Sequence, residues 1–390
     1  MNMSAGIARR KSLDSGLTAA KIRRLKMQHE THTTHQLAAW LIAGVVASFS
    51  AAEAAPLSLS NSPLYLTTPV APNIVVTLDD SGSMTWGAVP DDIAGYGSSN
   101  QTVKNSRRWK SAYFNPIYYN PNVIYTRPVD ATGTPLSTSF STAYRNGFDP
   151  SRGSVNLSTS YRPMDVYAPS SDCSSTGNTT CHYADNPAVD FPGQTTAGVA
   201  AYYYVFDTSL INCSATSTDE DCYRKVTVST TSGPGALDLN GDGTIDALDK
   251  DERQNFANWY SFYRTRNLMT VSGAALAFST LSADVRVAWQ NLHTCTSFGT
   301  NCQGWTSTNY DNRIRKFTGT HRTNFYNWLF RLPASGGTPL RSAVERAGNY
   351  FTTSGITSPY AYDPQVTAAP EYSCRGNYSV VMTDGMWNTD

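Results

Sequence analysis

The strongest signal in this chain is the run Ile74-Val75-Val76-Thr77-Leu78-Asp79-Asp80-Ser81-Gly82-Ser83-Met84. Its first half is β-branched and apolar without alternation, which is typical of a buried strand in a parallel sheet. Its second half places Asp79, Ser81 and Ser83 in a D-x-S-x-S pattern just past the carboxyl end of that strand, where open α/β sheets bind ligands. Carboxylate and hydroxyl oxygens suit Mg²⁺, Mn²⁺ or Ca²⁺ rather than zinc. A polar turn without an ion is the alternative interpretation.

Two later segments present oxygen ligands in a similar way. Tyr378-Ser379-Val380-Val381-Met382-Thr383-Asp384-Gly385 is a second apolar strand that ends at an acid. Between the two strands, Ser335-Gly336-Gly337-Thr338-Pro339-Leu340 places a threonine in a loop before a helical segment. All three segments adjoin elements that fit one parallel sheet. We therefore expect a single ion site built from Asp79, Ser81, Ser83, Thr338 and Asp384.

Periodicity outlines the remaining elements. Apolar residues from Phe256 to Leu281 keep helical spacing and predict a helix. Residues 285–289 then predict a strand, and residues 322–330 and 341–351 predict two more helices. The fold class expected is α/β, with a doubly wound, mostly parallel sheet. Residues 86–250, which are rich in Tyr, Asn, Ser and Gly, predict a large loop- and β-rich insertion with short strands at 199–206 and 225–228.

The composition favours an exported protein. Only 15% of the 390 residues are charged, the net charge is zero, and 23 residues are tyrosine. A neutral chain has no basic footprint for nucleic acid, so no nucleic-acid partner is expected.

The first 55 residues have the features of a secretory signal peptide. Basic residues up to Lys26 precede a short apolar run, Leu37 to Phe49, and Ala52-Glu53-Ala54 offers a cleavage site. Translation from either Met1 or Met27 fits this pattern. A single membrane anchor is the alternative, but the apolar run is short for a span, and no transmembrane helix is expected after cleavage. Residues 56–72 then form an extended, proline-containing lead-in.

Seven cysteines agree with export to an oxidising compartment. Six of them fall into pairs that are close in sequence, and the seventh, Cys374, is left over. Spacing alone leaves every connectivity open, and the local disulfide candidates are Cys173–Cys181, Cys213–Cys222 and Cys295–Cys302.

A second ion site is predicted inside the insertion. Residues 238–249 match an EF-hand-like calcium loop, in which Gly243 permits the sharp turn. No helix precedes this loop, so we expect a calcium loop with an exit helix rather than a full EF-hand; an ion-free polar turn is the alternative. The side chains expected to converge on Ca²⁺ are Asp238, Asn240, Asp242, Asp246 and Asp249, with Thr244 at the position that uses its backbone carbonyl.

The three loops around D-x-S-x-S, G-G-T-P-L and T-D-G together resemble the metal-ion-dependent adhesion site of von Willebrand factor type A domains, which have a Rossmann-like fold. The resemblance implies that Ser81, Ser83 and Thr338 bind the ion directly, while Asp79 and Asp384 act mainly through bound waters. It also implies that one coordination position is left for an acidic group of a partner.

The segments 69–84, 255–266 and 336–340 further resemble the PilY/PilC family of type IV pilus tip-associated adhesins and biogenesis factors. That likeness implies an A-like domain over residues 73–390, interrupted by the insertion, and a location in the periplasm, at the cell surface or at the pilus tip. Minor pilins and host-cell or surface ligands with an acidic group are the implied partners. An A domain needs further strand and helix material after Asp384, so the sequence looks truncated at its C-terminus, with the family's β-propeller beyond it.

The resemblance thus implies an exported, divalent-cation-dependent adhesion and assembly protein of the type IV pilus tip, and two other functions are alternatives to it. A general exported A-domain binding protein, unrelated to pili, would use the same ion site. An enzyme would need a base beside Ser81 or Ser83, and His182, His293 and His321 show no triad or metal spacing. We therefore expect no catalytic activity.

Overall fold

The computed structural model describes residues 70–89, 107–161, 199–217, 219–231, 251–303, 308–372 and 374–385, and positions 238, 239, 243, 244, 246 and 249. The predicted signal peptide, most of the lead-in and the predicted Cys173–Cys181 pair lie outside these residues. Within the described ranges, no helix has the length and apolar character needed to cross a membrane.

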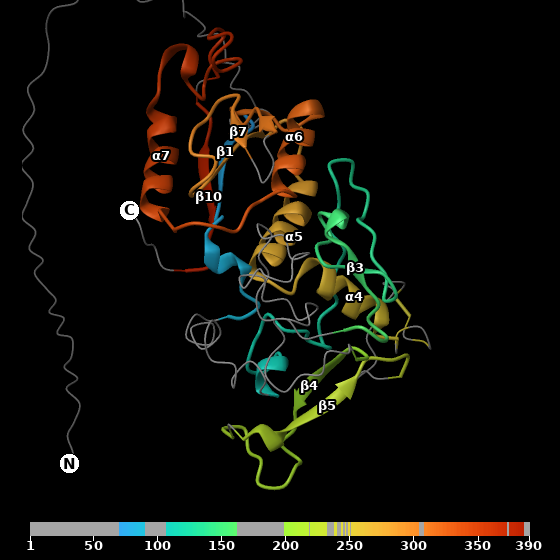
Figure 1. Cartoon of the computed structure of the whole chain (residues 1–390). Helices are drawn as coiled ribbons and strands as arrows, with labels where there is room; N and C mark the ends of the chain where they lie inside the picture. The colour runs from blue at the N-terminus through green and yellow to red at the C-terminus, as the bar shows by residue number, and fades with distance from the viewer. Residues whose placement is uncertain are drawn as a thin grey trace, which may run out of the picture. The chain divides into compact units, whose positions relative to one another are not determined.

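A four-stranded sheet is the centre of the fold. Its strand order is β10-β1-β6-β9, with β1 at Asn73–Leu78, β6 at Arg286–Asn291, β9 at Arg315–Lys316 and β10 at Asn377–Met382 (Figure 1). Strands β10, β1 and β6 are parallel, and β9 is antiparallel to β6. The predicted strands at 74–78, 285–289 and 378–382 are therefore confirmed, in a mixed rather than purely parallel sheet.

Helices cover both faces of β1 and β6. On one face Val76, Leu78 and Trp289 pack with α5, Arg266–Ser279, and α6, Gly319–Leu329. On the other face Val75 and Ala288 pack with α7, Leu340–Thr352. Successive strand residues point to opposite faces, so burial on both faces accounts for the unbroken apolar run of β1. The helices predicted at 322–330 and 341–351 are confirmed as α6 and α7.

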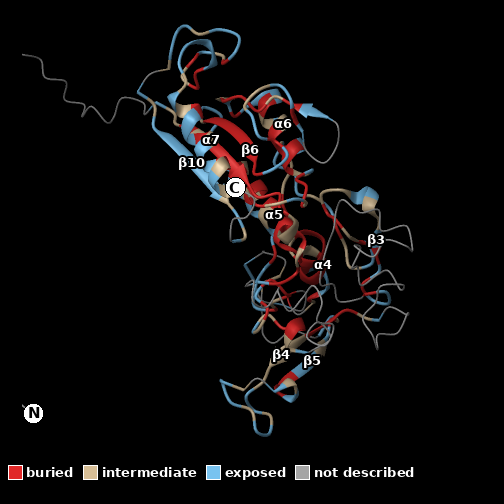
Figure 2. Ribbon diagram, turned by 60° about the vertical axis from the view of Figure 1, so that its left-hand side comes forward, coloured by how far each residue is buried: buried red, intermediate tan, exposed pale blue. Residues whose placement is uncertain are grey.

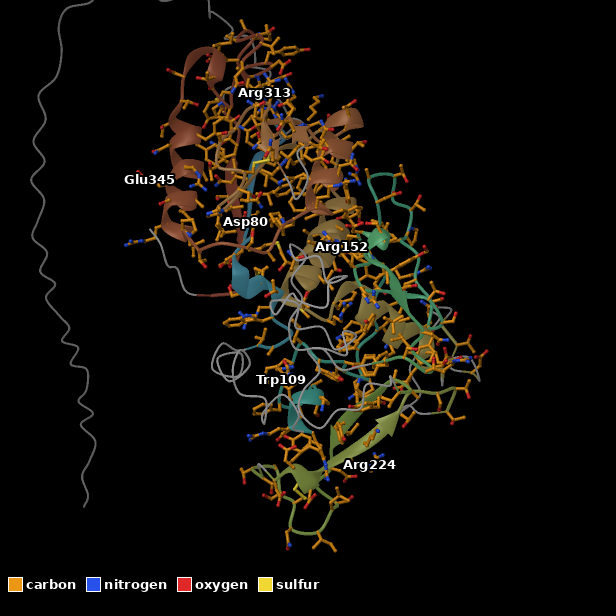
Figure 3. All side chains as sticks on the ribbon, viewed as in Figure 1. Asp80, Trp109, Arg152, Arg224, Arg313 and Glu345 are labelled. Carbon is orange, nitrogen blue, oxygen red and sulfur yellow. A yellow bond between two sulfur atoms is a disulfide. The ribbon has the colours of Figure 1, made fainter. Side chains whose placement is uncertain are left out.

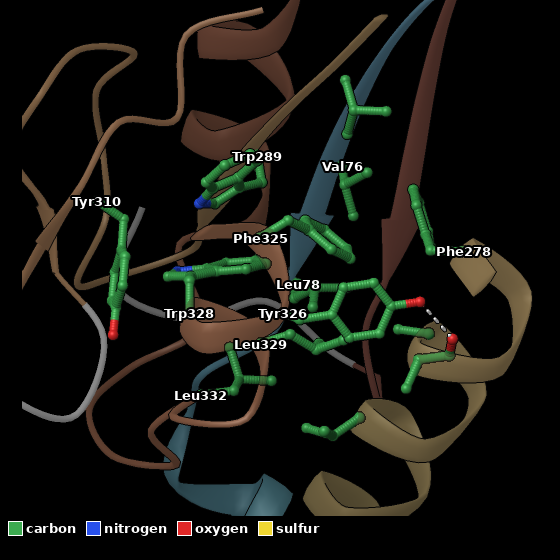
Figure 4. Close-up of a cluster of buried hydrophobic side chains, with 14 of the residues drawn as sticks. Val76, Leu78, Phe278, Trp289, Tyr310, Phe325, Tyr326, Trp328, Leu329 and Leu332 are labelled. Carbon is green, nitrogen blue, oxygen red and sulfur yellow. Dashed lines mark hydrogen bonds between the residues drawn. The ribbon is translucent and has the colours of Figure 1, made fainter. Parts of the chain in front are cut away.

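Aromatic side chains of α6 fill the space between that helix and β6 (Figure 4). The Phe325 and Trp328 rings lie 5.5 and 5.8 Å from the Trp289 ring. The Tyr326 hydroxyl donates a hydrogen bond of 2.9 Å to the Ala275 carbonyl of α5. Each buried aromatic ring contributes a large apolar area, so this cluster fixes α5 and α6 against the sheet.

One helix expected from periodicity is in fact two. The expectation of a continuous helix from Phe256 to Leu281 is wrong, because α4 spans Arg253–Phe262 and α5 begins at Arg266. Thr265 has extended backbone angles, and its side chain accepts a hydrogen bond of 3.3 Å from the Leu268 N–H. A threonine that caps a helix start in this way satisfies an otherwise unpaired N–H, so the break occurs although the apolar spacing continues.

The region between β1 and α5 has its own aromatic core. Tyr119 and Tyr203 pack around Phe256 and Trp259 of α4, which lies at the centre of this core. The strands predicted at 199–206 and 225–228 are confirmed as a hairpin. The small elements of this region are β2, Ala143–Tyr144; β3, Ser154–Val155; β4, Tyr202–Phe206; β5, Tyr223–Thr227; and the 3-10 helices η3, Arg108–Lys110, η4, Pro150–Arg152, and η5, Glu220–Cys222.

Strand β10 is an exposed edge of the sheet. Tyr378, Val380 and Val381 are 58%, 38% and 37% exposed, and Figure 2 shows the strand in the colour of exposed residues, whereas β6, on the other side of β1, is in the colour of buried residues. The side chains of neighbouring residues on this strand point to opposite faces. Both faces of β10 are therefore open to solvent in this chain.

Two of the three predicted disulfides are present. Cys213–Cys222 closes the tip of the β4–β5 hairpin, and Cys295–Cys302 joins the loop after β6 to β7, Cys302–Gln303, which pairs with β8, Asn309–Tyr310. Cys374 is exposed and forms no disulfide among the described residues. The last short element is η6, Gly355–Thr357.

Candidate functional site

The predicted ligands lie at the carboxyl edge of the parallel strands. Asp79 follows β1 directly, and the 3-10 helix η2, Gly82–Thr85, begins three residues later. Leu78 pairs in register with Met382 of β10, so Asp79 and Thr383 leave the sheet side by side. Helix α5, which follows β1, and helix α7, which precedes β10, cover opposite faces of the sheet. The chain connections at these two neighbouring strands therefore run to opposite faces, and the strand ends between such connections are the usual ligand position in open α/β sheets.

Hydrogen bonds join four of the five predicted ligands into one network. The Ser83 hydroxyl donates to Asp384 Oδ1 at 3.1 Å and lies 3.1 Å from the Ser81 hydroxyl oxygen. Asp79 Oδ1 accepts from the Ser81 backbone N–H at 2.8 Å, and Asp79 Oδ2 accepts from the Thr383 hydroxyl at 2.7 Å. Residues 301 positions apart in the sequence, Ser83 and Asp384, are thus in direct contact.

The loop that carries the fifth predicted ligand, Thr338, is attached to the first loop through the backbone. The Ser335 N–H donates to the Asp80 carbonyl at 2.7 Å, and the Gly82 N–H donates to the Gly336 carbonyl at 3.1 Å. Thr338 itself is buried. These backbone bonds hold the threonine loop against the D-x-S-x-S loop, next to the start of α7.

Gly336 is required by the geometry of this loop. Its φ is +95°, and a Cβ at this position would lie 3.1 Å from Cγ of the His293 ring. A side chain would be disfavoured by both the backbone conformation and the contact. The glycine therefore lets the threonine loop approach the end of β6 closely.

Asp80 supports the site by linking the end of β1 to the loop after β6, and nothing in the sequence pattern singled it out. Its side chain is fully buried at the end of β1, where Figure 3 labels it. Its carboxylate accepts from the His293 N–H at 2.9 Å, the Thr294 N–H at 2.9 Å and the Thr294 hydroxyl at 2.7 Å. Because both oxygens face the loop after β6, Asp80 binds β1 to β6 and is turned away from the hydroxyl network.

Arg266 is a second residue that the sequence did not indicate. Its Nη1 donates to Asp384 Oδ2 at 2.7 Å, and the two side chains are only 4% and 10% exposed. The expected continuous helix placed Arg266 in a helix interior, so no role at the site was predicted for it. In the structure Thr265 caps α5, and Arg266 is the first residue of that helix. The one available signal was a threonine before an Arg-Asn-Leu run, which fits a helix start.

Burial dominates the electrostatics of the two buried acids. It raises the pKa of Asp384, and the nearby Asp79 carboxylate raises it further, while the bonds from Arg266 and Ser83 act in the opposite direction. Burial also raises the pKa of Asp80, against the hydrogen bonds from Thr294 and His293. The site therefore concentrates negative charge where water stabilises it poorly, which favours a nearby positive charge.

The donor set fits a hard divalent cation. The four carboxylate oxygens of Asp79 and Asp384 accept hydrogen bonds from protein groups, which leaves hydroxyl lone pairs as the direct ligands. Such an all-oxygen set matches Mg²⁺ or Mn²⁺. In the described part of the chain, no group of three histidine, cysteine, aspartate or glutamate side chains could hold a metal ion alone. Any ion here would therefore depend on Ser81, Ser83 and Thr338.

The predicted calcium loop is described only in part, and Asn240 and Asp242 lie outside the described residues. Gly243 has a φ of +82°, as expected for the sharp turn, and its N–H donates to Asp238 Oδ2 at 2.8 Å. Asp249, which is buried, accepts from the Leu239 N–H at 3.2 Å and from the Asp246 N–H. The acids at the two ends of the loop thus close it through its own backbone, and α4 follows at Arg253.

Three curated relatives from Pseudomonas aeruginosa match this chain, and each is named type IV pilus biogenesis factor PilY1. The protein from strain PAO1 is 43% identical over 366 residues, which is 91% of this chain and 27% of the relative. The protein from strain PAK is 39% identical over 369 residues, 91% of this chain and 27% of the relative. The protein from strain UCBPP-PA14 is 37% identical over 349 residues, 86% of this chain and 25% of the relative.

No protein-family model and no solved structure matches the chain. The chain spans about a quarter of the length of the curated relatives it matches. The name these relatives share is that of a pilus biogenesis factor and includes no catalytic activity. With identities of 37–43% over about nine-tenths of its length, this chain belongs to the PilY/PilC family of type IV pilus biogenesis factors.

Proposed function

We propose that this chain is the ion-binding part of an exported type IV pilus biogenesis protein. In this proposal its sheet is a von Willebrand A-like domain, whose divalent cation holds an acidic group of a surface, a host ligand or a minor pilin. The observation that carries the proposal is the partly buried network in which Ser81, Ser83, Asp79 and Asp384 come together from the ends of two parallel strands. The PilY1 relatives supply the link to the pilus.

The charges of the network support an acidic ligand. Two carboxylates and Arg266 surround the hydroxyls, so the local charge is negative before an ion binds and positive once a divalent ion is added. An ion held mainly by neutral hydroxyls keeps most of its charge available for a further ligand. A carboxylate of the partner is then the natural group to complete the coordination.

The calcium loop has a separate role in this proposal. Ca²⁺ bound by residues 238–249 would rigidify the segment that leads directly into α4, whose Phe256 and Trp259 form the core of the inserted region. Calcium would therefore set the order of this region rather than bind the ligand. Limited proteolysis tests this role, because cleavage within 238–249 should slow with calcium and should be unchanged by calcium in an Asp249→Asn variant.

Isothermal titration calorimetry with Mg²⁺ and Mn²⁺ measures the affinity of the chain for these ions and tests the ion site. Asp79→Asn and Asp384→Asn each remove a charge without changing the size of the side chain, and they should abolish cation binding at this site, though not at residues 238–249, while thermal melting remains cooperative. Asp284→Ala removes an acid that is 74% exposed and paired with Lys316, so it serves as the matched control. Equal Mg²⁺ affinity in the wild type and both site variants would rule out this assignment.

The link to pili is tested in cells. A strain that lacks the full-length protein is complemented with the wild type, Asp384→Asn or Asp284→Ala, and surface pili and attachment are scored with and without a chelator. The proposal expects Asp384→Asn to reproduce the chelated wild type and Asp284→Ala to restore function. Normal piliation and attachment in the deletion strain would favour a binding function unrelated to pili.

A further inference from the structure

Arg266 occupies an unusual position for a cation, because it contacts one of the two acids of the candidate ion site. Its Nη1 lies 2.7 Å from Asp384 Oδ2, and both side chains are at least nine-tenths buried. The other oxygen, Oδ1, accepts the bond from Ser83. The Ser83 bond is compatible with an ion, since a hydroxyl that donates its proton to a carboxylate still offers lone pairs to a metal. The Arg266 bond instead places a fixed positive charge on the same carboxylate.

The segment that leaves β1 for the inserted region holds Arg266 in place. The Arg266 backbone N–H donates to the Trp86 carbonyl at 3.0 Å, and its Nε donates to the Ala88 carbonyl at 2.8 Å. The guanidinium carbon also lies 5.1 Å from the centre of the Trp86 ring. The arginine is therefore fixed by the start of the excursion between β1 and α5, at Trp86 and Ala88, and not by Asp384 alone.

We propose that Arg266 acts as an internal competitor of the divalent cation for Asp384, and that it lowers the cation affinity of the site. This inference rests on the proposed ion site and names a residue that regulates it. When an ion binds to the nearby hydroxyls, its charge and the guanidinium charge both act on the Asp384 carboxylate, and the two positive charges repel each other. Because the same side chain binds the Trp86–Ala88 segment, ion occupancy and the conformation of that segment are coupled, and each affects the other equally.

The size of the effect follows from Coulomb's law. A unit charge about 6 Å from a divalent ion changes the ion's affinity roughly tenfold at the dielectric constant of water, and more where the site is buried. Arg266→Gln removes the charge and keeps a hydrogen-bond donor, so it should bind Mg²⁺ at least about tenfold more tightly than the wild type. Arg266→Lys keeps the charge and should stay within about threefold of the wild type.

The test is isothermal titration of Mg²⁺ and Mn²⁺ into the full chain carrying each variant. Arg152→Gln is the matched control, because it removes an arginine charge that pairs with Asp149 in the inserted region, and it should leave the affinity unchanged. Tighter binding by Arg266→Gln alone supports the proposal. Equal or weaker binding by Arg266→Gln overturns it, since Arg266 would then position Asp384 for the ion.

A second measurement follows the wild type during the titration, and a variant serves only to assign one resonance. With ¹⁵N-labelled arginine, the Nε–H resonance of Arg266 is assigned by its absence in Arg266→Lys and is followed during a Mg²⁺ titration. A shift that saturates with the binding isotherm supports the proposal, and an unmoved resonance at saturating Mg²⁺ overturns it. If neither the wild type nor Arg266→Gln binds Mg²⁺ or Mn²⁺, the ion site itself fails; if only Arg266→Gln binds, competition by Arg266 is complete.

Discussion

The buried His321 imidazole makes the stability of the sheet depend on pH. His321 lies on α6 and is 8% exposed, and its Nε2 is 2.7 Å from the Val287 carbonyl oxygen of β6. A carbonyl can only accept, so the neutral ring carries its proton on Nε2. Burial is the main cause that lowers the pKa of His321 from 6.5 to about 4, with Arg315 and Arg286 nearby acting in the same direction, while the Val287 bond and Asp311 oppose it.

The sign and size of the effect follow from this pKa shift. Between pH 6.5 and about 4 the unfolded chain binds the proton and the folded chain does not. The free energy of unfolding therefore rises with pH through this window and is lost as the pH falls. A histidine pKa lowered from 6.5 to about 4 corresponds to roughly 3 kcal/mol of unfolding free energy. That is a large part of the ordinary stability of a domain.

Urea unfolding of the wild type and His321→Gln at pH 7 and pH 4.5 measures this contribution. Glutamine does not titrate, and its amide still offers an N–H to Val287. Burial also raises the pKa of the Asp80 and Asp384 carboxyl groups, but it does so in both proteins, so their contribution cancels in the comparison. We expect the wild type to lose about 2–3 kcal/mol more than His321→Gln between the two pH values. Equal losses in the two proteins would refute the assignment of a buried, neutral histidine.

Two further substitutions test the loop and the sheet edge. Gly336→Ala should cost about 1–3 kcal/mol of unfolding free energy, because of the φ of +95° and the contact with His293. The control is Gly348→Ala in α7, where a Cβ meets nothing within 4 Å, and it should be neutral or slightly stabilising. Equal melting temperatures of the two variants would contradict a strained loop. An exposed apolar edge strand promotes self-association, so Val381→Lys on β10 should reduce concentration-dependent association in light scattering. Val344→Lys, at a residue of α7 that is 48% exposed, should not, and identical association of both variants would show that β10 is not the contact.

The sheet was largely predictable because its strands carry their own signals. β1 is apolar at successive positions since both of its faces are covered, and β10 shows the same pattern with an acid at its end. The contact between Ser83 and Asp384 follows once both strands are placed in parallel register. Burial was not predictable for β10, because an apolar run does not reveal which strand lies at the edge of a sheet.

The residues that support the site were harder to predict. Arg266 was hidden because the apolar spacing of α4 continues into α5, and only the conformation of Thr265 separates the helices. The D-x-S-x-S pattern singles out Asp79, but it does not reveal that the neighbouring Asp80 accepts hydrogen bonds from the loop after β6. In both cases the role depends on a partner far along the chain, which local spacing does not encode.

We expect one divalent cation to bind between the loops that follow β1 and β10 and the loop that precedes α7. A crystal of the chain grown with Mn²⁺ and measured at an anomalous wavelength tests this site most directly. A single strong anomalous peak is expected at this edge of the sheet, with the hydroxyl oxygens of Ser81, Ser83 and Thr338 about 2.2 Å away. A peak only at residues 238–249, or none at the three hydroxyls, would contradict this expectation.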